Sequence, residues 1–355
     1  MSAHQQVVAA RHRLKIGLDR HAVIETCCEH REMSVMQNEQ VNRLRLREIV
    51  QAFQAAGGLS APFAESYVQW YAGVVQHFGE WARTCARPPI IGVSGCQGSG
   101  KSTLAKLMGQ TMCQLHGVRA VVLSLDDFYL TKEERRQMAA DIHPLLITRG
   151  VPGTHDVPLL LHTIEQLRAG HDGVSLPVFD KASDDRAVMQ QWRTSPPGTE
   201  LIILEGWCVG LSPQPIAELE PPVNVLEREQ DAHLVWREGI NEQLLGPYAT
   251  LFAELDVLLF LQAPHFDSVL EWRWEQEQQL SAQYQSAHPA DPDLTMSRED
   301  VVTFISHYQR LTEHALATLP QQADYVWALA EDRSVSSLRI QAGGTRRKVC
   351  SKNKS

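Results

Sequence analysis

The segment GCQGSGKS (95–102) matches the pattern G-x-x-x-x-G-K-[ST] at every position and lies between an apolar run and a helical pattern. Glycines in this phosphate-binding loop, or P-loop, let backbone N–H groups wrap a phosphate, and the following helix adds its positive end. The lysine supplies charge to the β- and γ-phosphates, and the last hydroxyl can ligate Mg²⁺. We therefore expect ATP and Mg²⁺ to bind here. The expected ligands are Gly95, Cys96, Gln97, Gly98, Ser99, Gly100, Lys101, Ser102 and Thr103.

Two acidic residues follow strand-length apolar runs, at the strand ends where ligands bind in open α/β sheets. Asp126 follows RAVVLSL (119–125), a strand that we expect beside the P-loop strand. Its carboxylate would orient or deprotonate an attacking hydroxyl, whereas the adjacent Asp127 is expected to be a turn or cap residue. Glu205 ends the apolar run of ELIILEGW (200–207), and we expect it to serve Mg²⁺, directly or through water, together with the P-loop serine.

Two loops are dense in charged and hydrogen-bonding groups: TRGVPGTHDVP (148–158) and PVFDKASDDR (177–186). Such loops can capture an anionic or polyhydroxylated small molecule. Each of their residues taken alone is more often a solvated loop charge, and Asp156 could merely cap the helix that follows it. The residues expected to contact this molecule are Tyr129, Arg149, Thr154, His155, Asp156, Lys181 and Arg186.

The segment WRWEQEQQL (272–280) places Arg273 in a helical pattern after an apolar run. Kinases that transfer a phosphoryl group often carry a mobile lid at this point, and its arginine neutralises charge that develops in the transition state. An amphipathic surface helix, with Trp272 and Trp274 packed on the core, explains the segment equally well. Arg273 is therefore a candidate catalytic residue alongside Lys101 and Asp126.

Apolar runs of strand length alternate with helical patterns from residue 88 onward. Strands are expected at 88–95, 119–125, 200–206 and 256–263, and helices at 101–115, 158–168, 231–254 and 266–282. This alternation is typical of βαβ units, so the fold class is α/β, a doubly wound, mainly parallel sheet of the P-loop NTPase type. The runs 325–329 and 334–340 are expected to close the sheet, and Ser297 with Asp300 forms a capping-box pattern before a helix over 297–316.

Four segments are expected along the chain. An N-terminal helical extension consists of helices at 44–58 and 61–82, the first of which ends at a pair of glycines. The basic tail is expected to be disordered. The segments are a lead-in of undetermined structure at 1–40, the helical extension at 41–85, a P-loop kinase domain at 86–341 and the tail at 342–355.

Composition narrows the possible partners and compartment. The 355 residues carry 33 basic and 42 acidic side chains, a formal net charge of −9, which argues against a general binder of nucleic acid or anionic membrane. No apolar run reaches the roughly 18 residues of a membrane helix. The seven cysteines form no C-x-x-C pair, which is typical of a reducing compartment. We expect a cytoplasmic protein without nucleic-acid or membrane partners; the oligomeric state is not indicated.

Five segments, taken in order, resemble the D-glycerate 3-kinase family, a branch of the P-loop kinases that include phosphoribulokinase, uridine kinase and bacterial pantothenate kinase. They are GCQGSGKS, SLDDFYLT, RGVPGTHD, PVFDKASDDR and ILEGWCVG, and the resemblance spans residues 88–341. It implies ATP-dependent phosphorylation of D-glycerate to 3-phosphoglycerate. It also aligns Asp126 with the catalytic acid of uridine kinases and Glu205 with the acid of their strand-E-G motif.

Two other functions remain open. A nucleoside or pantothenate-like kinase on the same scaffold should have more aromatic stacking surface around its acceptor, whereas the Arg, Lys and His side chains of these loops fit a carboxylate better. A nucleotide-binding regulator or assembly NTPase is the alternative outside small-molecule kinases. The guanine motif N-K-x-D of GTP switches does not occur, because the only Asn-Lys pair is Asn353–Lys354.

Overall fold

The computed structural model describes residues 40–56, 60–287 and 295–341. The expected lead-in, apart from residue 40, and the expected basic tail therefore lie outside the described residues. The chain divides into two compact units, residues 1–51 and 52–355. Residues 40–55 are helical.

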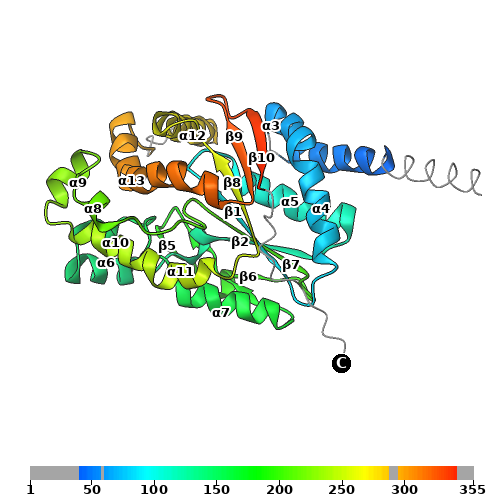
Figure 1. Cartoon of the computed structure of the whole chain (residues 1–355), viewed down its shortest axis with the longest axis horizontal. Helices are drawn as coiled ribbons and strands as arrows, with labels where there is room; N and C mark the ends of the chain where they lie inside the picture. Colours follow the sequence, from blue (N-terminus) through cyan, green and yellow to red (C-terminus); the bar gives the residue numbers. More distant parts are fainter. Residues whose placement is uncertain (1–39, 57–59, 288–294, 342–355) are drawn as a thin grey trace, which may run out of the picture. The chain divides into compact units, whose positions relative to one another are not determined.

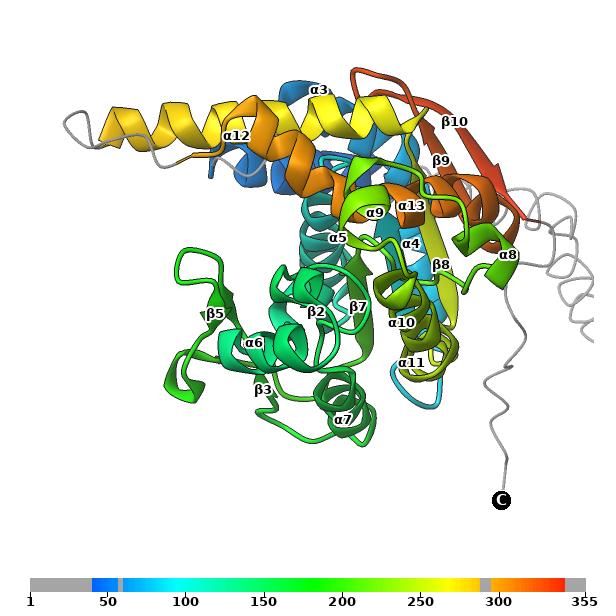
Figure 2. The same cartoon turned by 90° about the vertical axis from the view of Figure 1, so that its left-hand side faces the viewer.

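A six-stranded sheet in the order β10-β9-β8-β1-β7-β2 forms the centre of the second unit (Figure 1). Five of these strands, from β9 to β2, are parallel to one another, and β10 pairs antiparallel with β9. Helices lie on both faces of the sheet (Figure 2), so the predicted α/β class is confirmed. The strands are β1 Ile90–Gly95, β2 Ala120–Ser124, β7 Leu201–Gly206, β8 Val257–Gln262, β9 Tyr325–Leu329 and β10 Val335–Ile340.

One expectation about strand order is wrong. The strand that precedes Asp126 does not lie beside the P-loop strand, because β7 pairs with both β1 and β2 and separates them. Glu205, near the end of β7, therefore lies between the P-loop and the turn that carries Asp126. Both acids still lie at the carboxyl edge of the sheet, where ligands bind in this class of fold.

The helices of the second unit have the following bounds: α3 Ala61–Ser66, α4 Ala72–Ala82, α5 Lys101–His116, α6 Lys132–Asp141, α7 Val157–Arg168, α8 Ile216–Leu219, α9 Val225–Gln230, α10 Val235–Leu245, α11 Pro247–Phe252, α12 Phe266–Ala287 and α13 Arg298–Gln322. A π-helical turn, Tyr67–Tyr71, joins α3 to α4. Short 3₁₀ turns are Leu125–Phe128, Pro144–Ile147 and Met189–Gln191, and two small antiparallel pairs are β3 Ser175–Leu176 with β6 Arg193–Thr194 and β4 Phe179–Asp180 with β5 Asp185–Arg186.

The helix predicted over 231–254 is two helices. Pro247 has no N–H to donate, and its ring clashes with the preceding turn of a helix, so α10 ends before it and α11 begins at it. The pattern of apolar residues continues across this break, which is why periodicity alone indicated a single element.

The segment from α3 to α4 packs on α5 and on the sheet through aromatic side chains. The Tyr67 hydroxyl donates to Thr111 Oγ1 of α5 at 2.9 Å. Tyr71 lies against Trp327 of β9 with their ring centroids 4.8 Å apart. Phe63 lies so close to the P-loop that a Cβ at Gly100 would be 2.8 Å from its ring. These helices therefore share the core of the second unit.

A buried ionic network fixes α13 to α9 and α10. Arg310 of α13 donates from Nε and Nη2 to the two carboxylate oxygens of Glu227, at 2.7 Å each, and Arg237 donates to Asp231 at 2.8 Å. All four side chains are buried. The network holds in place the helix that carries Phe304 and Tyr308, two residues of the cavity described below.

Replacing Arg310 by Met is expected to destabilise the fold by about 3–5 kcal/mol, because Glu227 would keep its charge in a buried setting without this partner. Urea unfolding followed by circular dichroism measures the loss. The matched control is Arg298→Met on the same helix, whose ion pair with Glu271 is exposed and worth less than about 1 kcal/mol. Equal losses in the two variants would contradict a stabilising role for the buried network.

Candidate active site

The P-loop connects β1 to α5 through a tight turn. The Ser99 N–H donates to the Cys96 carbonyl at 3.3 Å, and the Ser99 hydroxyl donates to the same oxygen at 2.8 Å. Gly98 and Gly100 have φ angles of 78° and 87°, which disfavour any residue with a Cβ. Burial raises the pKa of the Cys96 thiol to about 12, so it stays neutral. The loop thus offers a phosphate its backbone amides, the N-terminus of α5 and Lys101.

Glu205 has the environment of a metal ligand. Its Oε1 accepts hydrogen bonds from Ser102 Oγ at 3.0 Å and Ser124 Oγ at 2.6 Å. Its Oε2 is buried and has no partner within the described part of the chain. A buried carboxylate oxygen without a partner is costly unless a cation or water completes it. Mg²⁺ takes oxygen ligands and usually combines one or two carboxylates with phosphates and water, so Glu205 and Ser102 fit this ion.

Asp126 lies in the 3₁₀ turn that follows β2 and faces the P-loop. The Tyr129 hydroxyl donates to its Oδ1 at 2.9 Å, and Lys181 Nζ donates to its Oδ2 at 3.0 Å. Burial opposes ionisation of this group, but Lys181 and Lys101 outweigh burial and lower its pKa to about 2. The carboxylate is ionised at neutral pH and is a weak proton acceptor, which favours an orienting role over deprotonation.

The adjacent Asp127 points elsewhere. Its carboxylate accepts from the Phe179 N–H at 3.3 Å and from Arg193 Nη2 at 2.8 Å, and burial raises its pKa. Asp127 does not line the cavity at the P-loop.

A cavity of about 430 Å³ opens beside the P-loop. It brings together nine residues expected from the sequence: Gln97, Gly98, Lys101, Ser102, Asp126, Tyr129, Arg149, Lys181 and Arg273. It also contains six that sequence reasoning missed: Trp207, Gln276, Gln279, Leu280, Phe304 and Tyr308. The only sequence signal for the missed residues is position, because Trp207 directly follows the Glu-Gly of β7, and Phe304 and Tyr308 are one helical turn apart.

Four of the seven residues that we expected to contact the small-molecule substrate do not line this cavity. Arg186 donates to the Tyr129 carbonyl at 2.9 Å and to Asp156 at 3.1 Å, and Asp156 accepts from the Leu159 N–H to cap α7. The Thr154 hydroxyl donates to the Val151 carbonyl within its own turn. These side chains hold the loops together and do not face the cavity.

His155, the fourth of them, lies behind Tyr129. Their rings stack at a centroid distance of 4.5 Å, and His155 Nδ1 pairs with the Tyr248 hydroxyl at 2.5 Å. Burial lowers the pKa of His155 to about 4, so the ring is neutral at neutral pH. The histidine therefore supports Tyr129, whose hydroxyl in turn holds Asp126.

Arg149 is held at the cavity wall by two aromatic residues. The Tyr308 hydroxyl donates to the Arg149 carbonyl at 2.9 Å, and Trp207 Nε1 donates to the Gly150 carbonyl at 2.8 Å. A Cβ at Gly150 would lie 2.0 Å from the Tyr308 hydroxyl oxygen, so only glycine permits this contact. The guanidinium group lies over the Phe179 ring at 5.3 Å and pairs with Asp184.

Arg273 contributes a second guanidinium group to the cavity. Its Nη2 pairs with Glu277 at 2.7 Å, and the group lies over the Phe304 ring at 5.5 Å. Its Nη1 is buried without a hydrogen-bond partner in residues 40–56, 60–287 and 295–341. An unsatisfied charged donor in a cavity beside a P-loop suits an anionic ligand such as a phosphate.

Comparison with known proteins agrees with this geometry. Residues 90–237 match the phosphoribulokinase/uridine kinase family. An uncharacterized kinase of Schizosaccharomyces pombe, mug58, is 35% identical over 242 residues, which cover 66% of this chain and 83% of that protein. The chain belongs to the phosphoribulokinase/uridine kinase family.

Two further relatives of this kinase are named after the substrate D-glycerate. The chloroplastic D-glycerate 3-kinase of Arabidopsis thaliana is 27% identical over 245 residues, which cover 65% of this chain and 48% of that protein. The solved structure of D-glycerate 3-kinase from Cryptococcus neoformans has a TM-score of 0.64 at 24% identity, covering 77% of this chain and 98% of that one. At this identity the structural likeness establishes the fold alone.

No helix among the described residues of the kinase is long and apolar enough to cross a membrane.

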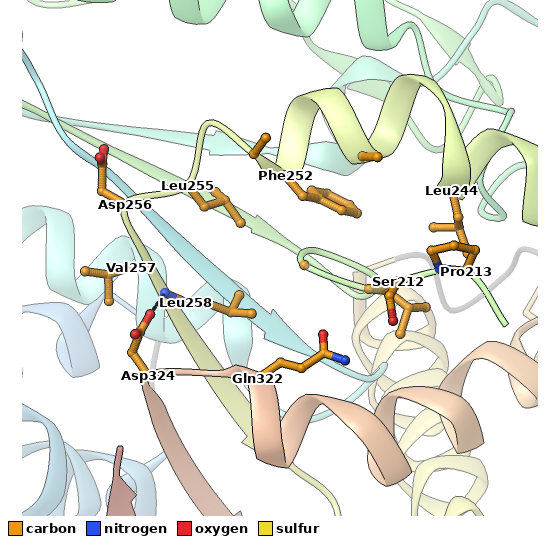
Figure 3. Close-up of a pocket in the computed structure, with 14 residues that line it drawn as sticks. Ser212, Pro213, Leu244, Phe252, Leu255, Asp256, Val257, Leu258, Gln322 and Asp324 are labelled. Carbon is orange, nitrogen blue, oxygen red and sulfur yellow. Dashed lines mark hydrogen bonds between the residues drawn. The ribbon is translucent and has the colours of Figure 1, made fainter. Parts of the chain in front are cut away.

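A second cavity of the kinase, of about 290 Å³, is lined in part by residues at the amino end of β8 (Figure 3). Apolar side chains such as Phe252, Leu255 and Leu258 line it. Its carboxylates are engaged in the fold: Asp256 pairs with Arg168 and accepts from the Ile90 N–H. No residue expected to do chemistry lines this cavity.

Proposed function

We propose that this kinase transfers the γ-phosphoryl group of ATP to a hydroxyl of a small hydroxy acid, with D-glycerate as the first candidate and 3-phosphoglycerate as its product. The observation that carries the proposal is the position of Arg149 in the same cavity as Lys101 and Asp126. An acceptor that binds there can place a carboxylate at Arg149 and a hydroxyl at Asp126. The names of two relatives support the choice of glycerate.

The nucleotide would be held by the P-loop amides and Lys101, and Mg²⁺ by Ser102 and Glu205. The ion, when bound, would neutralise charge on the phosphates. Lys101 and Arg273 would stabilise the charge that develops on the transferred group, since both line the cavity.

Asp126 would orient the acceptor hydroxyl for in-line attack. Phosphoryl transfer usually passes through a loose transition state, in which the hydroxyl loses its proton late. A strong base is then unnecessary, which agrees with the low pKa of Asp126. Lys181 would hold the carboxylate in place, and Tyr129, backed by His155, would fix its other oxygen.

Among the three basic residues expected to meet the acceptor, Arg149 is the best placed to hold its carboxylate. Arg186 is turned away to Asp156, and Lys181 already pairs with Asp126. The Arg149 side chain is 24% exposed and has donors beyond the one that meets Asp184. A guanidinium group can offer a carboxylate two parallel hydrogen bonds.

Arg149→Met is expected to raise the KM for D-glycerate by about ten- to a hundredfold, because a charged hydrogen bond contributes roughly 1.5–3 kcal/mol. The KM for ATP should change little, since Arg149 does not belong to the P-loop. Steady-state kinetics with coupled ADP detection measures both. The control is Arg193→Met, which removes an exposed arginine that pairs with Asp127 outside the cavity. If glycerol, which lacks the carboxylate, is phosphorylated as well as glycerate, the hydroxy-acid assignment fails and the kinase assignment stands.

A nucleoside-type acceptor is the second candidate, and one observation favours it. Trp207, Phe304 and Tyr308 add aromatic surface to the cavity that the sequence did not reveal. Base stacking on such rings is a common mode of recognition. An ADP-release screen over glycerate, pantothenate, uridine and ribulose 5-phosphate separates the candidates. ATP hydrolysis that does not depend on any acceptor would instead indicate a regulatory or assembly NTPase.

A further inference from the structure

Arg333 occupies an unusual position in the turn between β9 and β10. Its φ angle is 67°, in the left-handed region that crowds the Cβ of any residue other than glycine. Backbone strain of this kind persists where the surrounding contacts over-determine it, and it is common at functional sites. None of the roles assigned above uses this arginine.

The Arg333 side chain reaches the P-loop. Its Nε donates to the Gly98 carbonyl at 2.9 Å. Its Nη2 pairs with Glu275 at 2.6 Å, and its guanidinium group lies over the Trp272 ring at 5.3 Å. Glu275 and Trp272 both belong to α12. One side chain therefore joins the P-loop, the β9–β10 turn and the helix that carries Arg273.

The Gly98 carbonyl is a sensitive point of the P-loop. Gly98 is the third residue of the turn that the Ser99 N–H closes onto Cys96. Glycine adopts positive and negative φ angles with similar ease. The peptide group between Gly98 and Ser99 can therefore rotate unless contacts on both of its sides fix it. Arg333 holds this peptide from its carbonyl side. The amides that follow, at the start of α5, then keep the orientation that a phosphate requires.

Trp272 closes the P-loop from another side. A Cβ at Gly98 would lie 2.5 Å from the Trp272 Cβ, so the helix and the loop are in direct contact. Trp272 Nε1 donates to the Glu331 carbonyl at 2.6 Å, in the same turn as Arg333. The contacts of Arg333 thus belong to a junction built from three parts of the chain, and the arginine is its charged member.

We propose that Arg333 is a positioning residue of the nucleotide site, which holds the P-loop in its phosphate-binding conformation before ATP arrives. Ordering a flexible loop on binding reduces affinity, and a loop that is already ordered avoids that loss. The proposal rests on the proposed use of ATP. It does not depend on which acceptor the kinase phosphorylates.

The main test is Arg333→Gly, because glycine accepts the left-handed backbone without strain and removes the whole side chain, while adding some backbone freedom to the turn. We expect the dissociation constant for ADP, measured by calorimetry without any acceptor, to rise about tenfold, the scale of one charged hydrogen bond. The KM for ATP should rise by a similar factor, and the KM for the acceptor should stay near that of the wild type.

Three variants separate this role from a general effect on folding. Arg333→Lys should bind ADP with intermediate affinity, since an ammonium group can reach Gly98 but cannot also stack on Trp272 as a planar group. Glu275→Gln removes the ion pair, leaves the bond to Gly98, and should have a smaller effect. Arg339→Met removes an arginine of the neighbouring strand β10 that bonds to the Pro320 carbonyl, and it should bind ADP as the wild type does.

Two results would overturn the proposal. The first is an unchanged dissociation constant for ADP in Arg333→Gly, whatever its melting temperature. The second is an equal rise in the KM values for ATP and the acceptor, which would indicate general loosening of the fold. A kinase that binds ADP but does not phosphorylate glycerate would refute the proposed substrate and leave this inference intact.

Discussion

Lys101→Ala is expected to reduce turnover by at least about 10³-fold while leaving the fold intact. Lys101 opens α5 beside Ser102 and supplies point charge to the transferring phosphate, where preorganised charge is worth most. Lys101 lines the cavity, and Lys181 still pairs with Asp126 when Lys101 is removed, so the loss should cost the fold little stability. Coupled ADP detection with saturating ATP, Mg²⁺ and acceptor measures kcat, and circular dichroism checks the fold.

The matched control for this prediction is Lys106→Ala, one turn and a half further along α5, where the side chain is exposed. This variant should turn over like the wild type. A kcat for Lys101→Ala within a few-fold of the wild type would show that the P-loop lysine does not meet the transferring phosphate.

Asp126→Asn is expected to lower kcat by about 10²-fold or more, the scale of misplacing a reacting group by about 1 Å, and to leave the affinity for ATP nearly unchanged. The amide keeps the shape of the side chain but loses the charge that Lys181 and the acceptor hydroxyl share. Because the pKa of Asp126 is about 2, its protonation lies far below neutral pH and should not limit the rate in ordinary buffers. Single-turnover measurements separate the chemical step from product release.

Asp127→Asn is the control for this second prediction, since its carboxylate binds Arg193 and the Phe179 N–H away from the cavity. Its effect on kcat should be small. If Asp127→Asn lowers kcat as much as Asp126→Asn or more, the residue that orients the hydroxyl is Asp127 and the assignment to Asp126 is wrong.

The P-loop could be predicted from the sequence because its chemistry is local. Eight consecutive residues set the turn, the helix start and the phosphate ligands. Asp126 and Asp127 are different, since nothing in their two-residue sequence decides which one faces the cavity. That choice depends on Arg193 and Phe179, which lie more than fifty positions away and hold Asp127.

Local sequence patterns also could not predict the order of the strands in the sheet. Strand-length runs indicate that a parallel sheet forms, but their order depends on how the connecting segments cross over it. β7 lies between β1 and β2 although it follows β2 by about eighty residues. For the same reason Arg149 and Arg186 look alike in the sequence, each in a charged loop, and only the fold turns the first to the cavity and the second to Asp156.

The contact of α3 and α4 with the sheet has a practical consequence for truncated versions of this protein. A fragment that started at residue 86, where the alternation of strands and helices begins, would lose the rings that cover Tyr325 and Trp327. It would also lose Phe63 from the side of Gly100. Uncovered aromatic surface of this kind promotes aggregation. A fragment suited to crystallisation or to screening of inhibitors should therefore begin ahead of Ala61.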